Sequence, residues 1–371
     1  MSAGVLFVAC GLIGLILMTI NENGRTSLSG SLQKCIFNYM QVASLFSRFP
    51  LRWPASMQGL FDVMGSFSTV GEHLVNPDCA SSLAGIGLFY AKQVGFLLLP
   101  IILILLARGV WQYYAWKKKI DFSARPTIGM TTPKDKFIVS VGVLLYLVFP
   151  TVCSQAFEIF NCKGVTGSGR YLMADMEEQC FVGRHLAFSL GLGLPQLFLY
   201  VLGIPLMGLH FLHRNRKKLR QLKVRTRYGL FLSGYKDSKY YWEFTIVVRK
   251  VGVVALTVFG TVLRVALQAQ LGSLIIIIAI MIQIAGKPYD VYGEGQERYR
   301  ILVFVELAEL VTVWSTLWLG LFMFLLDDTG GELTIKEILT VLTVIINAIL
   351  LVFMVVAMLR EKIYENENSR L

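Results

Sequence analysis

Long apolar runs separated by shorter polar segments dominate the chain. Eight runs of about 18 to 26 residues are long enough to cross a hydrocarbon core of about 30 Å as helices. They cover residues 3–20, 83–106, 137–157, 186–211, 244–262, 265–285, 301–326 and 338–359. The runs are apolar on all faces, whereas strands of a membrane barrel alternate apolar and polar residues over roughly 10 positions. The pattern predicts an all-α, polytopic membrane helix bundle.

The segment between the first two runs allows two arrangements. It contains IFNYMQVASLF and, after Pro50 and Pro54, ASMQGLFDVMGSF, both with helical apolar spacing. Either the two form amphipathic helices on the outer surface and the amino terminus is cytosolic, or residues 30–49 cross once and that terminus is outside. The first run could also be a signal peptide, but no Lys or Arg precedes it and no small-residue cleavage pattern follows.

We therefore expect eight or nine transmembrane helices. The expected parts are a first transmembrane helix (1–27), an amphipathic or crossing segment with an outer loop (28–82), a multi-helix membrane domain (83–359) and a cytosolic tail (360–371).

Composition and charge agree with a membrane protein and orient it. The 371 residues are 55% apolar and 16% charged, which excludes an ordinary soluble globule. The net charge is +11, and 23 of the 35 Lys and Arg residues lie on alternate loops against six on the opposite loops. By the positive-inside rule the basic loops and the carboxyl terminus are cytosolic. This explains the charge without nucleic acid as a partner.

Two cysteines flank the outer loop between the third and fourth of the chain's long apolar runs. A disulfide between Cys162 and Cys180 is expected on this oxidising side, and closing the loop would add about 3 kcal/mol of stability in the chain-entropy model. Cys79 is the competing partner for either cysteine. We predict no metal site, because no CxxC spacing occurs and His185 stands alone.

Charged residues inside apolar runs are the candidate transport site. Glu306 and Glu309 share a helical face, and Glu309 lies about 12 Å into its run at 1.5 Å per residue. Lys92 lies about 14 Å into the second run from the opposite side, so we hypothesise that it faces one of these carboxylates. A structural ion pair without a transport role is the alternative. Further polar candidates for the bundle interior are Gln93, Gln196, Gln283 and Asn347.

Arg249 and Lys250 lie just inside the fifth run. We expect them to snorkel to the inner face or to pair with Glu243. The alternative is that they bind anionic lipid headgroups together with a dense basic cluster. That cluster consists of Arg214, Arg216, Lys217, Lys218 and Arg220.

Enzymatic chemistry is not indicated. The sequence has no Walker loop, no HExxH and no GxSxG, and its four histidines offer little material for acid-base work. We predict neither an enzyme nor a cofactor.

The cytosolic loop and fifth run read RTRYGLFLSGYKDSKYYWEFTIVVRK. Their aromatic order resembles the carboxyl-terminal membrane domain of the transient receptor potential (TRP)-like family, which includes fungal flavin-carrier-like and polycystin-like proteins and large surface proteins of protists. Also similar to the protist branch are NYMQVASLFSRFPLRWP with Cys79, the outer loop with Cys162, Cys180 and His185, and ELAELVTVWSTLWLGLF. The resemblance covers roughly residues 30 to 330.

The resemblance implies a bundle of about nine helices that acts as a calcium-permeable channel or a small-molecule transporter. We expect a cation channel or channel-related domain in the plasma membrane, where such relatives carry ectodomains. A secondary transporter of a solute such as a flavin is the first alternative, and a heptahelical receptor or membrane anchor is the second. The expected partners are the bilayer, anionic lipids and a permeant cation or small solute. A homo-oligomer is compatible with the channel, the transporter and the receptor.

Overall fold

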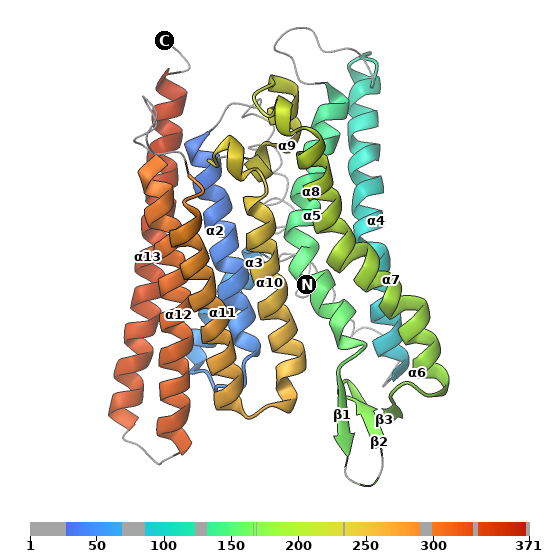
Figure 1. The fold of residues 1–371 in the computed structure, drawn as a ribbon, viewed down its shortest axis with the longest axis vertical. Helices are drawn as coiled ribbons and strands as arrows, with labels where there is room; N and C mark the ends of the chain where they lie inside the picture. Colours follow the sequence, from blue (N-terminus) through green and yellow to red (C-terminus); the bar gives the residue numbers. More distant parts are fainter. Residues whose placement is uncertain are drawn as a thin grey trace. The chain divides into compact units, whose positions relative to one another are not determined.

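The computed structural model of the chain describes residues 27–68, 86–122, 132–165, 167, 169–232, 234–289, 299–328 and 333–368. The chain divides into two compact units, one formed by residues 1–24 and 69–228 and the other by residues 25–68 and 229–371. Each unit is described by itself below (Figure 1).

Seven of the described helices are long and apolar enough to cross a membrane. They overlap seven of the eight predicted apolar runs, and most ends agree within four residues. The exceptions are the spans Gly87–Lys117 and Thr334–Glu367, which continue beyond the ends of their runs, and Asp237–Val262, which begins before its run. The eighth run, at residues 3–20, lies outside the described residues. The helical fold and the multi-pass membrane character are thereby confirmed.

The first unit is built from α4 to α9. Proline and a capping box fix where α5 begins, because Thr132 accepts from the Asp135 backbone N–H while the Asp135 side chain accepts from Thr132. Two π-helical turns, Ser189–Gly193 and Leu197–Leu202, join three short α-helical pieces into one long helix. The helices are α4 (Ile86–Lys117), α5 (Pro133–Glu158), α6 (Gly183–Phe188), α7 (Leu194–Gln196), α8 (Gly203–Arg214) and α9 (Leu222–Leu232).

The loop between α5 and α6 folds into a small antiparallel sheet that the helical pattern did not predict. Strands β1 (Cys162–Val165), β2 (Gly169–Leu172) and β3 (Asp175–Gln179) pair in sequence order. Gly167 and Gly169 have φ values of +83° and +105°, which favour glycine and make the tight turn between β1 and β2. In Figure 1 the sheet projects from the end of the unit opposite α9.

The second unit is built around α2. This helix packs against α3, α10, α12 and α13, and fourteen of its eighteen residues are buried. Contacts with four helices and burial of most of its length make α2 an interior helix of this unit, and whether it crosses the membrane stays a prediction. The helices are α2 (Leu28–Leu45), α3 (Ala55–Ser68), α10 (Trp242–Phe259), α11 (Val265–Gly286), α12 (Arg300–Asp328) and α13 (Leu333–Asn368).

A carboxylate near the end of α13 caps the beginning of α2. Glu365 accepts hydrogen bonds from the backbone N–H groups of Leu28 and Ser29 at 2.7 and 3.3 Å, and from the hydroxyls of Ser27 and Ser29 at 2.9 and 2.6 Å. The first N–H groups of a helix lack intrahelical partners and favour negative charge. The two helices therefore run antiparallel, with the start of α2 beside the end of α13.

Two glycines in the second unit lie directly against large aromatic rings, in space that a Cβ atom would otherwise fill. A Cβ added at Gly286, at the end of α11, would lie 2.0 Å from a ring carbon of Trp242, at the start of α10. Gly320 on α12 similarly admits Trp53, with a separation of 2.2 Å. These glycines allow close helix packing.

We expect Gly286→Ala to destabilise the second unit by about 1 to 3 kcal/mol, because the buried Trp242 ring cannot move without leaving a cavity. Thermal unfolding followed by tryptophan fluorescence would measure the change. Gly252→Ala on α10 is the matched control, since its Cβ would meet only Ile275 at 3.8 Å or more. Equal unfolding temperatures for the two variants would contradict the packing argument.

Candidate functional site: a buried ionic network

Six ionisable side chains from α2, α10 and α12 are buried inside the second unit. None is more than 8% exposed. We call them the ionic network, which consists of Lys34, Glu243, Arg249, Lys250, Glu306 and Glu309. Three are cations and three are anions, so the set is formally neutral. Buried charges of this kind in a membrane protein are costly and mark functional sites by default.

Two contacts between α2 and α10 repeat with the same spacing. Lys34 Nζ lies 2.9 Å from Glu243 Oε2, and Lys250 Nζ donates to Gln41 Oε1 at 2.6 Å. On each helix the two residues are seven apart, which is about 10 Å along the axis. The two helices therefore run parallel and in register, with polar positions facing each other.

The carboxylates of α12 find their partners on α10 and α11. An Arg249 guanidinium nitrogen donates to Glu309 Oε1 at 3.5 Å, and Gln283 Nε2 donates to Glu306 Oε2 at 2.6 Å. Among the described residues, Glu309 Oε2 and Arg249 Nε have no hydrogen-bond partner. Glu243 Oε1 also lacks a partner within the described part of the chain, but the Lys34–Glu243 contact is shorter, 2.9 Å against 3.5 Å for Arg249–Glu309.

Tyrosines border the ionic network near the start of α10. Tyr235 donates its hydroxyl to Glu243 at 3.2 Å, and Lys34 Nζ lies 4.1 Å from the centre of the Tyr235 ring. Tyr235 also forms a backbone bridge with Tyr289, and the Lys236 N–H donates to the Pro288 carbonyl at 2.8 Å. The loops after α9 and α11 therefore join beside the ionic network.

The predicted interior amides are buried. Asn347 on α13 accepts from the Tyr39 hydroxyl at 2.6 Å and donates to Thr316 at 2.8 Å, so it links α13 with α2 and α12. Gln283 belongs to the surroundings of Glu306, while Gln93 and Gln196 belong to the first unit, each fully buried.

Lys92 lies half-buried on α4 in the first unit, whereas Glu306 and Glu309 lie in the second. Its proposed pairing with one of these carboxylates stays a prediction. Within their own unit the carboxylates are already held, Glu309 by Arg249 and Glu306 by Gln283.

Arg249 and Lys250 are buried in the second unit instead of snorkelling, with Arg249 3.5 Å from Glu309 and Lys250 donating to Gln41. Glu243 lies 2.9 Å from Lys34, and its expected pairing with Arg249 or Lys250 stays a prediction. Burial also removes both from the candidate lipid-binding set. The remaining five members are exposed in the first unit, namely Arg214, Arg216, Lys217, Lys218 and Arg220.

Sequence reasoning missed Lys34 and Gln41. Both lie on α2, whose polar residues suggested a surface helix. Their partners Glu243 and Lys250 are 209 residues away in each case. The shared seven-residue spacing of the two pairs was the signal present in the sequence, and it becomes meaningful only when α2 and α10 are known to be neighbours.

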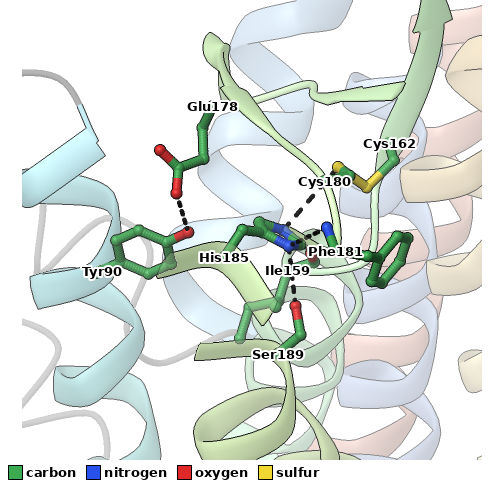
Figure 2. Close-up of a disulfide and its surroundings, with 8 residues drawn as sticks. All are labelled: Tyr90, Ile159, Cys162, Glu178, Cys180, Phe181, His185 and Ser189. Atoms are coloured by element: carbon green, nitrogen blue, oxygen red, sulfur yellow. Dashed lines mark hydrogen bonds between the residues drawn. A yellow bond between two sulfur atoms is a disulfide. The ribbon is translucent and has the colours of Figure 1, made fainter. Parts of the chain in front are cut away.

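The predicted disulfide between Cys162 and Cys180 is confirmed, and it closes the base of the small sheet in the first unit (Figure 2). Cys79, the competing partner, lies outside the described residues. His185 stands beside the bridge, with Nε2 4.0 Å from the Cys180 sulfur. Because both sulfurs are in the disulfide, neither is a thiolate ligand for a metal ion.

His185 attaches the sheet to the membrane helix that follows. The Phe181 backbone N–H donates to His185 Nδ1 at 3.0 Å, so the ring proton is on Nε2, which lies 3.0 Å from the Ile159 carbonyl. Figure 2 shows the ring between these two groups, with the Ser189 hydroxyl also facing Nδ1. Both ring nitrogens of His185 are therefore engaged in hydrogen bonds that connect the sheet to the helix.

Glu178 on β3 holds the sheet to two helices. It accepts from Arg184 on α6 at 2.7 Å and from the Tyr90 hydroxyl on α4 at 3.2 Å, the latter seen in Figure 2. The Arg184 hydrogen bond, opposed by partial burial and aided by Tyr90, lowers the pKa of the Glu178 carboxyl below its ordinary value.

We expect this attachment to be pH-dependent. A lowered pKa means that Glu178 stabilises the folded state fully above the ordinary glutamate pKa of about 4.3, and that this contribution is lost as the pH falls through the lowered value. Thermal unfolding of the wild type and of Glu178→Gln should therefore differ at neutral pH and converge in acid. A difference that persists unchanged into strong acid would contradict the assignment.

Comparisons with known proteins give one distant similarity. The chain is 24% identical over 209 residues to "Cysteine repeat modular protein A" of Toxoplasma gondii. The alignment covers 53% of this chain but 6% of that protein, whose name refers to cysteine repeats and to no activity. No family model matches the chain, and no solved structure matches it.

Proposed function

We propose that this chain is a TRP-like cation channel, or the membrane domain of one, and that the ionic network controls permeation. The observation that carries the proposal is the burial of three cations and three anions inside one bundle of membrane helices. Intramembrane ionisable residues mark ion pathways and voltage- or ligand-sensitive elements in membrane proteins.

The position of the ionic network supports a role in transport. Lys250 is eight residues from the start of α10 and Glu309 is nine from the start of α12, which places both about 12 to 14 Å along their helices. That depth is near the middle of a hydrocarbon core of about 30 Å. Stability alone does not require such groups, since apolar residues of similar volume are often as stable as a buried ion pair.

The described conformation is a closed one. All six side chains are engaged or enclosed, so an ion could pass through the ionic network only after its pairs exchange partners. The contact best suited to open first is Arg249–Glu309, because it is long and leaves one atom of each partner without a hydrogen bond among the described residues.

The topology that we propose adds α2 to the seven apolar spans. With the three-residue helix Phe46–Arg48 behind it, α2 is about 31 Å long, enough to cross. It runs parallel to α10, whose start follows a basic loop, so α2 would begin in the cytosol together with the end of α13.

This orientation is tested with a membrane-impermeant thiol reagent on intact cells. The reagent should label Met176→Cys but not Glu367→Cys, and labelling of Glu367→Cys would reject the orientation.

The channel proposal is tested by recording current across a planar bilayer that contains the purified protein, with calcium and potassium gradients. We expect discrete conductance steps that Glu309→Gln changes in size or open time, because it removes the charge that holds Arg249. Glu178→Gln, the same chemical change in the outer sheet, is the matched control and should leave the steps unchanged. Silence of the wild type under voltage, calcium and stretch would contradict the proposal.

A secondary transporter of a small organic solute such as a flavin is the second candidate. It is favoured by the enclosure of every member of the ionic network, as expected of an occluded site rather than of a continuous pore. Proteoliposomes would then accumulate the solute without conductance steps, and Glu309→Gln would lower the uptake rate. Solute uptake equal to that of empty liposomes would reject this candidate.

The exposed basic cluster Arg216–Lys218 with Arg214 and Arg220 is proposed to bind anionic lipid headgroups of the inner leaflet. Replacing the five residues with Gln should weaken binding to vesicles that contain phosphatidylserine, and unchanged binding would reject the idea.

A further inference from the structure

Uncharged polar side chains from three helices meet inside the first unit. Gln93 on α4 donates through Nε2 to Gln155 Oε1 on α5 at 3.3 Å. Gln196 on α7 donates through Nε2 to the Gln93 carbonyl at 3.1 Å. Gln93 and Gln196 are fully buried, and Gln155 is 9% exposed. We call this set the amide layer.

A second polar layer lies one turn along the helices. The Tyr200 hydroxyl donates to the Leu97 carbonyl, four residues beyond Gln196 and Gln93 respectively. On α5, which runs in the opposite direction, Thr151 precedes Gln155 by four residues and so lies on the same face. The repeated spacing indicates that α4 and the π-helical segment are in register here, as α2 and α10 are in the second unit.

Three side-chain oxygens of these layers accept no hydrogen bond from the described residues. Among the described residues, Gln93 Oε1, Gln196 Oε1 and Thr151 Oγ1 are buried with no hydrogen-bond partner. Both glutamines have committed their Nε2 groups to protein acceptors, so their oxygens remain as acceptors only. Buried acceptors without a partner are costly, and within a membrane no bulk water is present to satisfy them.

A proline frees a backbone acceptor about one turn beyond Gln93 on α4. Pro100 lacks an N–H, so the Phe96 carbonyl on α4 loses its normal helical donor. The facing helix is π-helical at Leu197–Leu202, a distortion that recurs at functional sites.

We propose that the amide layer and Thr151 bind a monovalent alkali-metal cation, potassium or sodium. Neutral oxygens can replace the hydration shell of such an ion, as carbonyl-lined filters do. The amide layer is bonded through the neutral Gln155 side-chain oxygen and the Gln93 carbonyl, whereas divalent cations prefer carboxylate ligands. Lys92 precedes Gln93, but consecutive helical residues point about 100° apart and Lys92 is half-exposed.

The proposal is tested by equilibrium binding of radioactive rubidium, as a potassium analogue, and of radioactive sodium to the full chain in lipid nanodiscs. We expect saturable binding of at least one ion that Gln93→Leu and Gln196→Leu weaken about tenfold or more, because each removes one ligand oxygen. Gln268→Leu is the matched control. Gln268 is a fully buried glutamine of the second unit whose Oε1 also lacks a partner among the described residues, and its loss should leave binding unchanged.

Gln196→Glu keeps the shape of the side chain and adds a negative charge. Gln196→Glu should therefore tighten cation binding about tenfold. This result would test the cation site even where the leucine variants do not fold. Absence of saturable binding by the wild type, or affinities that these variants leave unchanged, would overturn the proposal and assign the site to water alone.

This inference does not rest on the channel proposal, because the binding assay needs no conduction. Glu309→Gln should leave cation binding to the amide layer unchanged even where it alters current. A protein that is silent in the bilayer but binds rubidium or sodium would reject the channel proposal and support this site.

Discussion

Glu243→Ala is expected to destabilise the second unit by about 3 to 5 kcal/mol, because it leaves the buried Lys34 ammonium without its counter-charge. It also removes the acceptor of the Tyr235 hydroxyl. The Tyr235 ring, 4.1 Å from Lys34 Nζ, would be the remaining favourable contact, and a cation–π interaction recovers only part of a lost ion pair. Unfolding in dodecyl sulfate, followed by tryptophan fluorescence, would measure the effect.

The double variant Lys34→Met with Glu243→Leu separates the cost of a broken pair from the net value of the pair. Replacing both partners with apolar side chains of similar size should restore stability to near the wild-type value. Glu178→Ala, which breaks an ion pair whose arginine is 54% exposed, is the control and should have a far smaller effect. Equal effects of Glu243→Ala and Glu178→Ala would contradict the burial of the network.

The same double variant also bears on function. If the ionic network serves only the fold, a stable double variant should keep whatever conductance or uptake the wild type shows. If the network controls permeation, activity should change although stability is kept. Measuring both properties on one variant therefore distinguishes the two roles that the sequence left open for the intramembrane charges.

Replacing both Cys162 and Cys180 with Ser is expected to lower stability by about 3 kcal/mol, because the bridge closes a loop of 18 residues and removes that freedom from the unfolded chain. The sheet should loosen first. The bridge joins the start of β1 to the residue after β3, so its loss frees both ends of the sheet at once. Hydrogen exchange of the β1–β3 backbone should therefore become faster than that of α5.

A reducing agent provides the matching experiment. The reduced wild type should behave as the double serine variant does, and the variant itself should not respond to the reagent. Cys153→Ala, which removes a buried free thiol from α5, should keep the wild-type response to reduction. An unfolding midpoint that is the same for wild type and double variant would show that the bridge is dispensable.

The local pattern of the sequence was sufficient for the membrane helices and the disulfide. Continuous apolar runs specify a buried helix whatever surrounds it, since a membrane leaves the backbone few other ways to satisfy its hydrogen bonds. Cys162 and Cys180 flank one short loop, which favoured their pairing over a bridge to the more distant Cys79. Burial of Glu306 and Glu309 also followed from their depth in an apolar run.

The tertiary structure alone decided which polar groups meet. The segment of α2 is too polar to be recognised as an apolar span, yet it is the central helix of its unit because its polar residues find partners on α10. Arg249 and Lys250 looked close enough to the surface to snorkel, but the rotation of α10 turns them inward, toward Glu309 and Gln41. The side on which a charge lies depends on helix rotation and neighbours, and a single sequence carries no information on partners 209 residues away until the helices pack.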